Sequence, residues 1–150
     1  MRLSKRGEYG LRAMIDLASW TQERNLVPIK EIAEREHIPV KFLEQILLTM
    51  KNAGLVSSRM GASGGYYLAR PTDQITLGQI IRLLDGPLAP IRCVSQMAYE
   101  PCSCPDETSC GLRSVMFEVR NAISDILDHK TLADVVHREE SKETLVQEKK

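Results

Sequence analysis

Apolar residues recur at helical spacing through the first third of the chain. Between residues 8 and 20 they fall on more than one face, which predicts a helix with neighbours on several sides. A shorter helical pattern covers residues 28–38. A tight turn separates it from a third pattern that stops at Gly54, a residue type that commonly closes helices. The buried face of the third helix is predicted from positions at i, i+3, i+4 and i+7, namely Leu43, Ile46, Leu47 and Met50.

Two short strand patterns follow the third helix, over residues 55–59 and 66–70. The turn between them contains Gly61, Gly64 and Gly65, and glycine can adopt a positive φ at little cost. A hairpin directly after a helix-turn-helix is a wing, and it argues against the simpler interpretation of a plain amphipathic bundle. The sequence therefore predicts a mainly α fold with a small β-hairpin wing.

A further helix is predicted to support the wing. Its apolar pattern spans residues 77–84, Thr76 is a candidate N-cap, and the Asp-Gly-Pro stretch at residues 85–87 is a stop signal. With this helix, residues 1–88 form a predicted winged helix-turn-helix DNA-binding domain.

The second helix of a helix-turn-helix presents its N-terminal residues to base edges in the major groove. Base readout is therefore predicted for Lys41, Glu44 and Gln45. Arg59 on the wing is placed to meet phosphate or the minor groove, and the wing turn adds Gly64 and Gly65 to the predicted DNA-binding residues. The net charge is zero, but the first 70 residues carry 11 Lys and Arg against 7 Asp and Glu, so the basic half comes first.

All the cysteines of the chain fall between residues 93 and 110, a stretch with three acidic residues and no Lys or Arg. Clustered thiolates repel one another unless a cation compensates them, so the segment favours a bound metal. The gaps of eight, one and five residues differ from the two to four of common zinc knuckles, which favours an iron–sulfur cluster over zinc. Buried free thiols and a redox disulfide remain open alternatives. The four cysteines are Cys93, Cys102, Cys104 and Cys110.

Apolar residues between 115 and 127 form two adjacent stripes at helical spacing, which together make a surface too wide for a solvated arm. The first stripe is Val115, Val119, Ala122 and Ile126, and the second is Met116, Ile123 and Leu127. This pattern favours a helix that packs on a partner chain, with an intramolecular core as the alternative. The expected division is then a cysteine-rich loop at 89–111, a long dimerisation helix and terminal turn at 112–137, and a charged, disordered tail at 138–150. We expect the loop to have little structure of its own.

Three stretches carry a resemblance to a known family: LSKRGEYGLRAMIDLA, FLEQILLTMKNAGLV and SGGYYLARP. They resemble the N-terminal helix, recognition helix and wing of the bacterial IscR/NsrR/CymR regulators, often called the Rrf family. The resemblance extends from Met1 to about Val136, and it implies a homodimeric transcription factor that binds a double-stranded DNA operator. Met60 stands where several members have a wing arginine, which weakens the expectation of minor-groove reading there.

The stretch CPDETSCGLRSVMFEVRNAI resembles the region in which many members hold an iron–sulfur cluster before the dimerisation helix. The resemblance implies Cys93, Cys104 and Cys110 as ligands, with Cys102 as an extra thiol that could take the middle role or complete a four-cysteine site. Glu8 occupies the position at which some relatives present a carboxylate to the partner's cluster. No histidine follows Cys110 closely, so the fourth ligand stays open, as does the choice between 2Fe-2S and 4Fe-4S.

No apolar run predicts a signal peptide or a membrane span, so we expect a cytoplasmic protein without membrane contact. No catalytic constellation is visible, so an enzyme is not expected. The predicted function is a regulator whose operator affinity is controlled by the cluster. The alternatives are a cluster-free repressor that responds to thiol chemistry or a ligand, a zinc-stabilised regulator, and a cluster-carrier protein.

Overall fold

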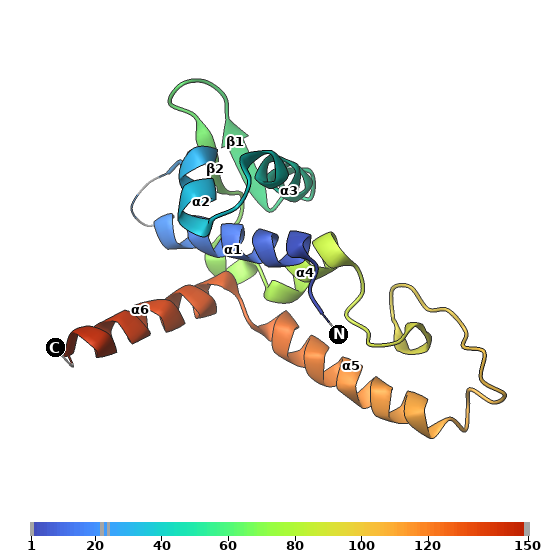
Figure 1. Cartoon of the computed structure of the whole chain (residues 1–150). Helices are drawn as coiled ribbons and strands as arrows, with labels where there is room; N and C mark the ends of the chain where they lie inside the picture. The colour runs from blue at the N-terminus through green and yellow to red at the C-terminus, as the bar shows by residue number, and fades with distance from the viewer. Residues whose placement is uncertain (1, 22, 24, 149–150) are drawn as a thin grey trace.

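The architecture is mainly helical, as the sequence predicts. The computed structural model describes residues 2–21, 23 and 25–148, and these residues form six α-helices, two 3-10 helices and one antiparallel hairpin (Figure 1). Among them, no helix is long and apolar enough to cross a membrane. The elements in chain order are α1 (Lys5–Trp20), α2 (Ile29–Glu36), α3 (Val40–Asn52), β1 (Val56–Arg59), β2 (Gly65–Leu68), η1 (Thr72–Gln74), α4 (Leu77–Asp85), η2 (Arg92–Val94), α5 (Gly111–His129) and α6 (Leu132–Glu148).

Helix α1 lies at the centre of the helical core and contacts α2, α3, α4 and α6, which explains why its sequence is apolar on more than one face. Its approach to α4 is close: a Cβ added at Gly10 would lie 2.0 Å from Leu84 Cδ1. The predicted inner face of α3 is confirmed, because Leu43, Ile46, Leu47 and Met50 are all buried in the same core.

The turn between α2 and α3 is sharp because His37 adopts the left-handed conformation, with φ 52°. Its backbone N–H bonds back to the carbonyl groups of Ala33 and Glu34, which closes α2. Pro39, the N-cap of α3, then starts the next helix. The predicted helix-turn-helix is therefore present.

The hairpin pairs Val56 with Leu68 and Arg59 with Gly65. Of the three glycines in its turn, Gly61 has a positive φ of 108°, whereas Gly64 and Gly65 do not, contrary to what we expected of them. These two glycines are instead required by close approach. A Cβ would lie 2.1 Å from Arg59 O at Gly64 and 2.6 Å from Val27 O at Gly65.

Helix α4 begins with the predicted cap. Thr76 Oγ1 accepts from Gln79 N at 3.2 Å, and Gln79 Oε1 accepts from Thr76 N at 3.1 Å, which forms a capping box. Next to this cap, Leu77 N donates to Lys130 O and Leu132 N donates to Ile75 O, both at 2.9 Å. The chain therefore returns after α5 to the point where α4 began.

The C-terminal segment differs from the prediction of a short turn and a disordered tail at 138–150. Helix α6 continues to Glu148, while residues 149–150 lie outside the described residues. Its start is anchored in the core by Leu132, which is fully buried. Glu, Lys and Arg are good helix formers, so a helix with an anchored first turn can continue through a charged sequence that has no apolar stripe.

Candidate DNA-binding surface and cysteine loop

The predicted base-reading residues lie on the outer side of α3. Lys41, Glu44 and Gln45 are exposed, whereas the opposite side of the helix is buried in the core. Helix α3 and the hairpin lie at the same end of the molecule, away from α5 and α6 (Figure 1). This end is therefore free to approach a duplex.

Two polar contacts fix α3 relative to its neighbours. Arg6 of α1 donates to Thr49 Oγ1 at 2.7 Å, and Lys51 Nζ donates to Ser58 Oγ in β1 at 2.8 Å. The second contact ties the wing to the helix that would enter the groove. Movement of one is therefore resisted by the other.

On the wing, Arg59 is exposed at the end of β1, and the following Met60 is 91% exposed. Gly64 and Gly65 are half-buried, and their lack of a side chain is explained by packing against backbone. Direct DNA contact by Arg59, Gly64 and Gly65 stays a prediction. In the structure, the two glycines allow the hairpin to turn close to the segment before α2.

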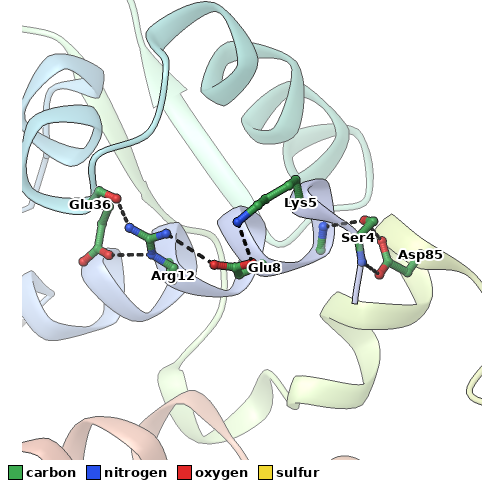
Figure 2. A network of polar contacts seen from close by, with 7 residues as sticks. Ser4, Lys5, Glu8, Arg12, Glu36 and Asp85 are labelled. Atoms are coloured by element: carbon green, nitrogen blue, oxygen red, sulfur yellow. Dashed lines mark hydrogen bonds and ion pairs between the residues drawn. The ribbon is translucent and has the colours of Figure 1, made fainter. Parts of the chain in front are cut away.

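A polar network runs along α1 to the turn of the helix-turn-helix (Figure 2). Glu8 pairs with Lys5 at 3.2 Å and with Arg12 at 3.6 Å. Arg12 Nε contacts Glu36 Oε2 at 3.2 Å, and Arg12 also donates to the Glu36 carbonyl at the end of α2. We call Glu8, Arg12 and Glu36 the Glu8 network. It links the first turn of α1 to the residue that precedes the helix-turn-helix turn.

The start of α1 is also held by α4. Ser4, the N-cap of α1, donates its backbone N–H to Asp85 Oδ2 at 2.8 Å, and its hydroxyl bonds to the other carboxylate oxygen (Figure 2). A Cβ at Gly7 would lie 2.6 Å from the same carboxylate. Helix α4 ends at Asp85, so the start of the segment that leads into the cysteine loop is fixed to the N-terminus of α1, one turn before Glu8.

The four cysteines occupy different environments within the cysteine loop, residues 89–111. Cys93 is buried in η2, Cys102 is half-buried, Cys104 is exposed, and Cys110 is the N-cap of α5. The pKa of Cys104 is raised to about 11, first by a hydrogen bond with the Cys102 thiol and by its charge, and less by Cys110. The loop thus places three thiols near one another.

These thiols do not form a closed metal site. Among the residues that the structure describes, no three Cys, His, Asp or Glu side chains are grouped so that they could hold a metal ion. The donor types fit a thiolate-bound metal, because four thiols share one short segment. Binding would have to draw the thiols closer together.

The loop has more structure of its own than we expected. The Asp106 carboxylate accepts from the Ser109 hydroxyl at 2.6 Å, from the Thr108 hydroxyl at 2.7 Å and from the Thr108 backbone N–H at 3.0 Å. These bonds lower the pKa of Asp106 to about 2. Tyr99 donates to Glu107 at 2.7 Å, which raises the pKa of the phenol.

Sequence reasoning missed two arginines that reach the loop from α5. Arg113 contacts Glu107 at 3.4 Å and donates to Cys93 O at 3.3 Å, so a cation does lie beside the cysteines. Arg120, which is buried, donates to Val94 O at 2.9 Å. The one available signal was that helical side chains point back toward the N-terminus, which directs Arg113 toward the Cys110 cap but does not identify Cys93 as its partner.

The exposed side of α5 carries the first of its two predicted apolar stripes. Val115, Val119 and Ile126 are exposed, whereas Met116, Ile123 and Leu127 of the second stripe are half-buried. The helix therefore uses one stripe against its own chain and leaves the other open.

The comparisons with known proteins agree with this architecture. A family model described as Rrf2, iron-dependent transcriptional regulator, matches residues 3–138. The HTH-type transcriptional regulator CymR of Bacillus subtilis is 37% identical over 135 residues, covering 90% of this chain and 89% of CymR. Its solved structure, described as the global cysteine regulator, matches with a TM-score of 0.77 at 35% identity, covering 92% and 98% of the two chains.

IscR proteins are similar to a comparable degree. A solved structure of T. potens IscR has a TM-score of 0.75 at 35% identity, covering 95% of this chain and 90% of that chain. IscR of Pectobacterium atrosepticum is 32% identical over 140 residues, covering 93% of this chain and 82% of its own length. The fold, the family model and the solved relatives agree over most of the sequence. The relatives are described as transcriptional regulators rather than enzymes. The chain belongs to the Rrf2 family of DNA-binding transcriptional regulators.

Proposed function

We propose that an iron–sulfur cluster held in the cysteine loop controls the affinity of this regulator for its DNA operator. The observation that carries the proposal is the concentration of all four cysteines in the stretch from 93 to 110. The family's description as iron-dependent supports it. Cys93, Cys104 and Cys110 would be the ligands, and Cys102 would be the extra thiol that could complete a four-cysteine site. A bound cluster would make the loop sensitive to iron supply, oxidants, oxygen or nitric oxide.

We propose that the active form is a homodimer in the cytoplasm. The open apolar stripe of α5 would pack against the same helix of a second copy, as a two-fold interface requires. Apolar side chains at this spacing along nearly two-thirds of a 19-residue helix suit helix-to-helix packing better than solvent.

In this dimer, Glu8 would provide the connection between the cluster and the DNA-binding surface. If the cluster of the partner takes Glu8 as a ligand, it competes with Lys5 and Arg12 for the same carboxylate. Loss of the Glu8 pair would change how Arg12 is held, and with it the contact of Arg12 with Glu36 at the end of α2. The orientation of α3 would then differ between the two states, which is the differential interaction that a change in DNA affinity needs.

A cluster-free repressor that responds to thiol oxidation is the second candidate. It is favoured by the contact between Cys102 and Cys104, and by the similarity to CymR, which is described as a cysteine regulator. A zinc-stabilised regulator or a cluster carrier would also use these cysteines. Metal and sulfide analysis together with operator binding distinguish these candidates.

The test is anaerobic purification followed by an absorption spectrum, iron, zinc and sulfide assays, and operator binding. Replacing Cys93, Cys104 or Cys110 by Ala should abolish iron binding and bring operator affinity to the apo value, about 5–150-fold from the holo value. Cys102→Ala should be milder, and Ser103→Ala is the matched control from the same loop.

Glu8→Ala should keep iron but hold it loosely. Full iron in the Cys104 and Cys110 variants would contradict the proposal, as would an operator affinity that does not change when the cluster is lost. Zinc in place of iron and sulfide would identify the zinc-stabilised form. An affinity that changes only with thiol oxidation would identify the cluster-free repressor. A loaded protein that does not select a DNA sequence would identify a carrier.

A further inference from the structure

Arg113 touches the cysteine loop at three points. Its backbone N–H donates to Cys110 Sγ at 3.4 Å, its Nε donates to Cys93 O at 3.3 Å, and Nε lies 3.4 Å from Glu107 Oε1. Cys93 begins the cysteine-bearing stretch, Glu107 lies in its second half, and Cys110 ends it. We propose that Arg113 is the positioning residue of the cysteine site, because its side chain fixes Cys93 against the first turn of α5.

Arg120 strengthens this arrangement from two turns further along α5. Its Nη1 donates to Val94 O at 2.9 Å, and its guanidinium lies 4.3 Å from the centre of the Phe117 ring. Arg113 and Arg120 are seven residues apart and therefore lie on the same face of the helix. Two consecutive carbonyl groups of η2 are thus each bound by an arginine of one helix face, and this fixes the backbone that carries Cys93.

The direction of the Arg113 side chain is itself fixed. The Glu107 carboxylate that pairs with it accepts from the Tyr99 hydroxyl at 2.7 Å. Tyr99 and Glu107 flank Cys102 and Cys104 in the sequence, so the contact chain also spans the middle of the loop. An arginine held by a carboxylate and by a backbone carbonyl has little freedom to leave the site.

The chemistry of arginine defines what this residue does. A guanidinium stays protonated and offers no lone pair, so Arg113 cannot be a metal ligand. It is a fixed positive charge beside groups that carry negative charge as thiolates. A nearby cation favours the more negative of two redox states, so Arg113 would raise the reduction potential of a cluster bound here. This second effect rests on the proposed function, whereas the placement of Cys93 does not.

The experiment separates the two effects with Arg113→Gln and Arg113→Lys, with Arg92→Gln as the matched control. Arg92 is also a loop arginine, but its guanidinium pairs with exposed Glu100. In the metal-free, reduced protein, labelling of each cysteine by iodoacetamide is followed by mass spectrometry. In the Arg113→Gln variant, iodoacetamide should label buried Cys93 about tenfold faster than in the unmodified protein. This is the factor expected for the loss of one hydrogen bond from a charged donor. Cys102 and Cys104 should be little changed.

Lysine keeps the charge but lacks the Nε–H that reaches Cys93 O. Arg113→Lys should therefore label Cys93 almost as fast as Arg113→Gln does. In the iron-loaded protein, by contrast, the midpoint potential of the Arg113→Lys variant should stay near that of the unmodified protein. The midpoint potential of the Arg113→Gln variant should be more negative, and this variant should release iron faster to a chelator. Arg92→Gln should match the unmodified protein in both measurements.

Unchanged Cys93 labelling in a folded Arg113→Gln protein, judged by circular dichroism, would overturn the proposal. So would an equal labelling effect of Arg92→Gln. The Lys variant keeps the labelling decisive if the Gln variant does not fold. If the unmodified protein binds no iron, the proposed function fails, but the labelling still decides whether Arg113 positions Cys93.

Discussion

The exposed side chains of α3 and of the wing suit different kinds of DNA contact. The amide of Gln45 can donate and accept at once, which allows a bidentate contact with adenine, and Lys41 can donate to guanine. Arg59 sits on the hairpin, where a charged side chain meets phosphate more readily than a base edge. Sequence selectivity and general affinity should therefore depend on different residues.

Replacing Gln45 or Lys41 by Ala should change which bases are preferred, at a cost of about 1–3 kcal/mol on the best sequence. Arg59→Ala should weaken binding on all sequences by similar amounts and reduce the salt dependence. Binding to a panel of single-base operator variants measures both effects. Lys142→Ala, on exposed α6, is the control. Equal losses on every sequence for all three variants would remove the readout assignment.

Individual residues were predictable where their environment follows from local spacing. Leu43 and Met50 are buried because they share one face of a helix, and Thr76 caps α4 because its hydroxyl reaches the backbone three residues ahead. Arg113 and Arg120 were not predictable in the same way. Their partners, Cys93 and Val94, are 20 and 26 residues distant in the sequence, and only the fold of the loop brings them together.

At the scale of elements, α4 and α5 are joined by an ion pair. Arg82 Nη2 contacts Asp128 Oδ2 at 2.9 Å, and Asp128 lies so close to Gly78 that a Cβ there would be 2.1 Å from its Oδ1. The hydrogen bonds from Arg82 lower the pKa of Asp128, and the charge of Arg82 acts in the same direction. Since the Asp128 side chain is 37% exposed, water screens the pair and its contribution is modest.

The sign of the pH dependence follows from the lowered pKa. The pair contributes stability that is fully present above the unfolded pKa of about 3.9 and is lost as pH falls through the lower folded pKa. Asp128→Asn should therefore reduce the free energy of unfolding at pH 7, and the difference from the unmodified protein should shrink below pH 4. Urea unfolding between pH 7 and pH 3 measures this. Asp125→Asn, one turn away and exposed, should show no such convergence.

Elements were predictable to the extent that their sequences carry an apolar period. Helices α1 to α5 and the hairpin all have one, and each was predicted near its observed position. Helix α6 has an apolar anchor at Leu132 and then mostly charged residues, so the pattern suggested a tail. Its helical form depends on docking of the first turn against α1 and η1, which a local pattern does not contain.

At the scale of the whole molecule, the open stripe of α5 defines the proposed dimer. Ile126→Glu would place a charge in the proposed interface, since Ile126 is 61% exposed and lies on this stripe. The variant should sediment at half the mass of the unmodified protein. Met60→Glu, an equivalent change on the wing, should leave the mass unchanged.

Two α3 helices related by a two-fold axis should read a pseudo-palindrome with half-sites about 34–36 Å apart, or a multiple of that distance. Selection from random DNA should return such a motif for the unmodified protein. Ile126→Glu should lose the preference for the full site over a half-site. A motif without dyad symmetry, or an Ile126→Glu protein that remains dimeric, would contradict the proposed assembly.

The bridge beside Thr76 and Thr131 has a topological consequence. The backbone N–H groups of Leu77 and Leu132 are bound by the carbonyl groups of Lys130 and Ile75. The segment that contains α4, the cysteine loop and α5 therefore begins and ends at the same place in the structure, where its two ends are bonded to each other. If the backbone were cut in the loop, the two fragments would still be joined by the hydrogen bonds beside Thr76 and Thr131 and by packing in the core. The loop can therefore be remodelled, ordered or even broken without unravelling the fold that carries α3.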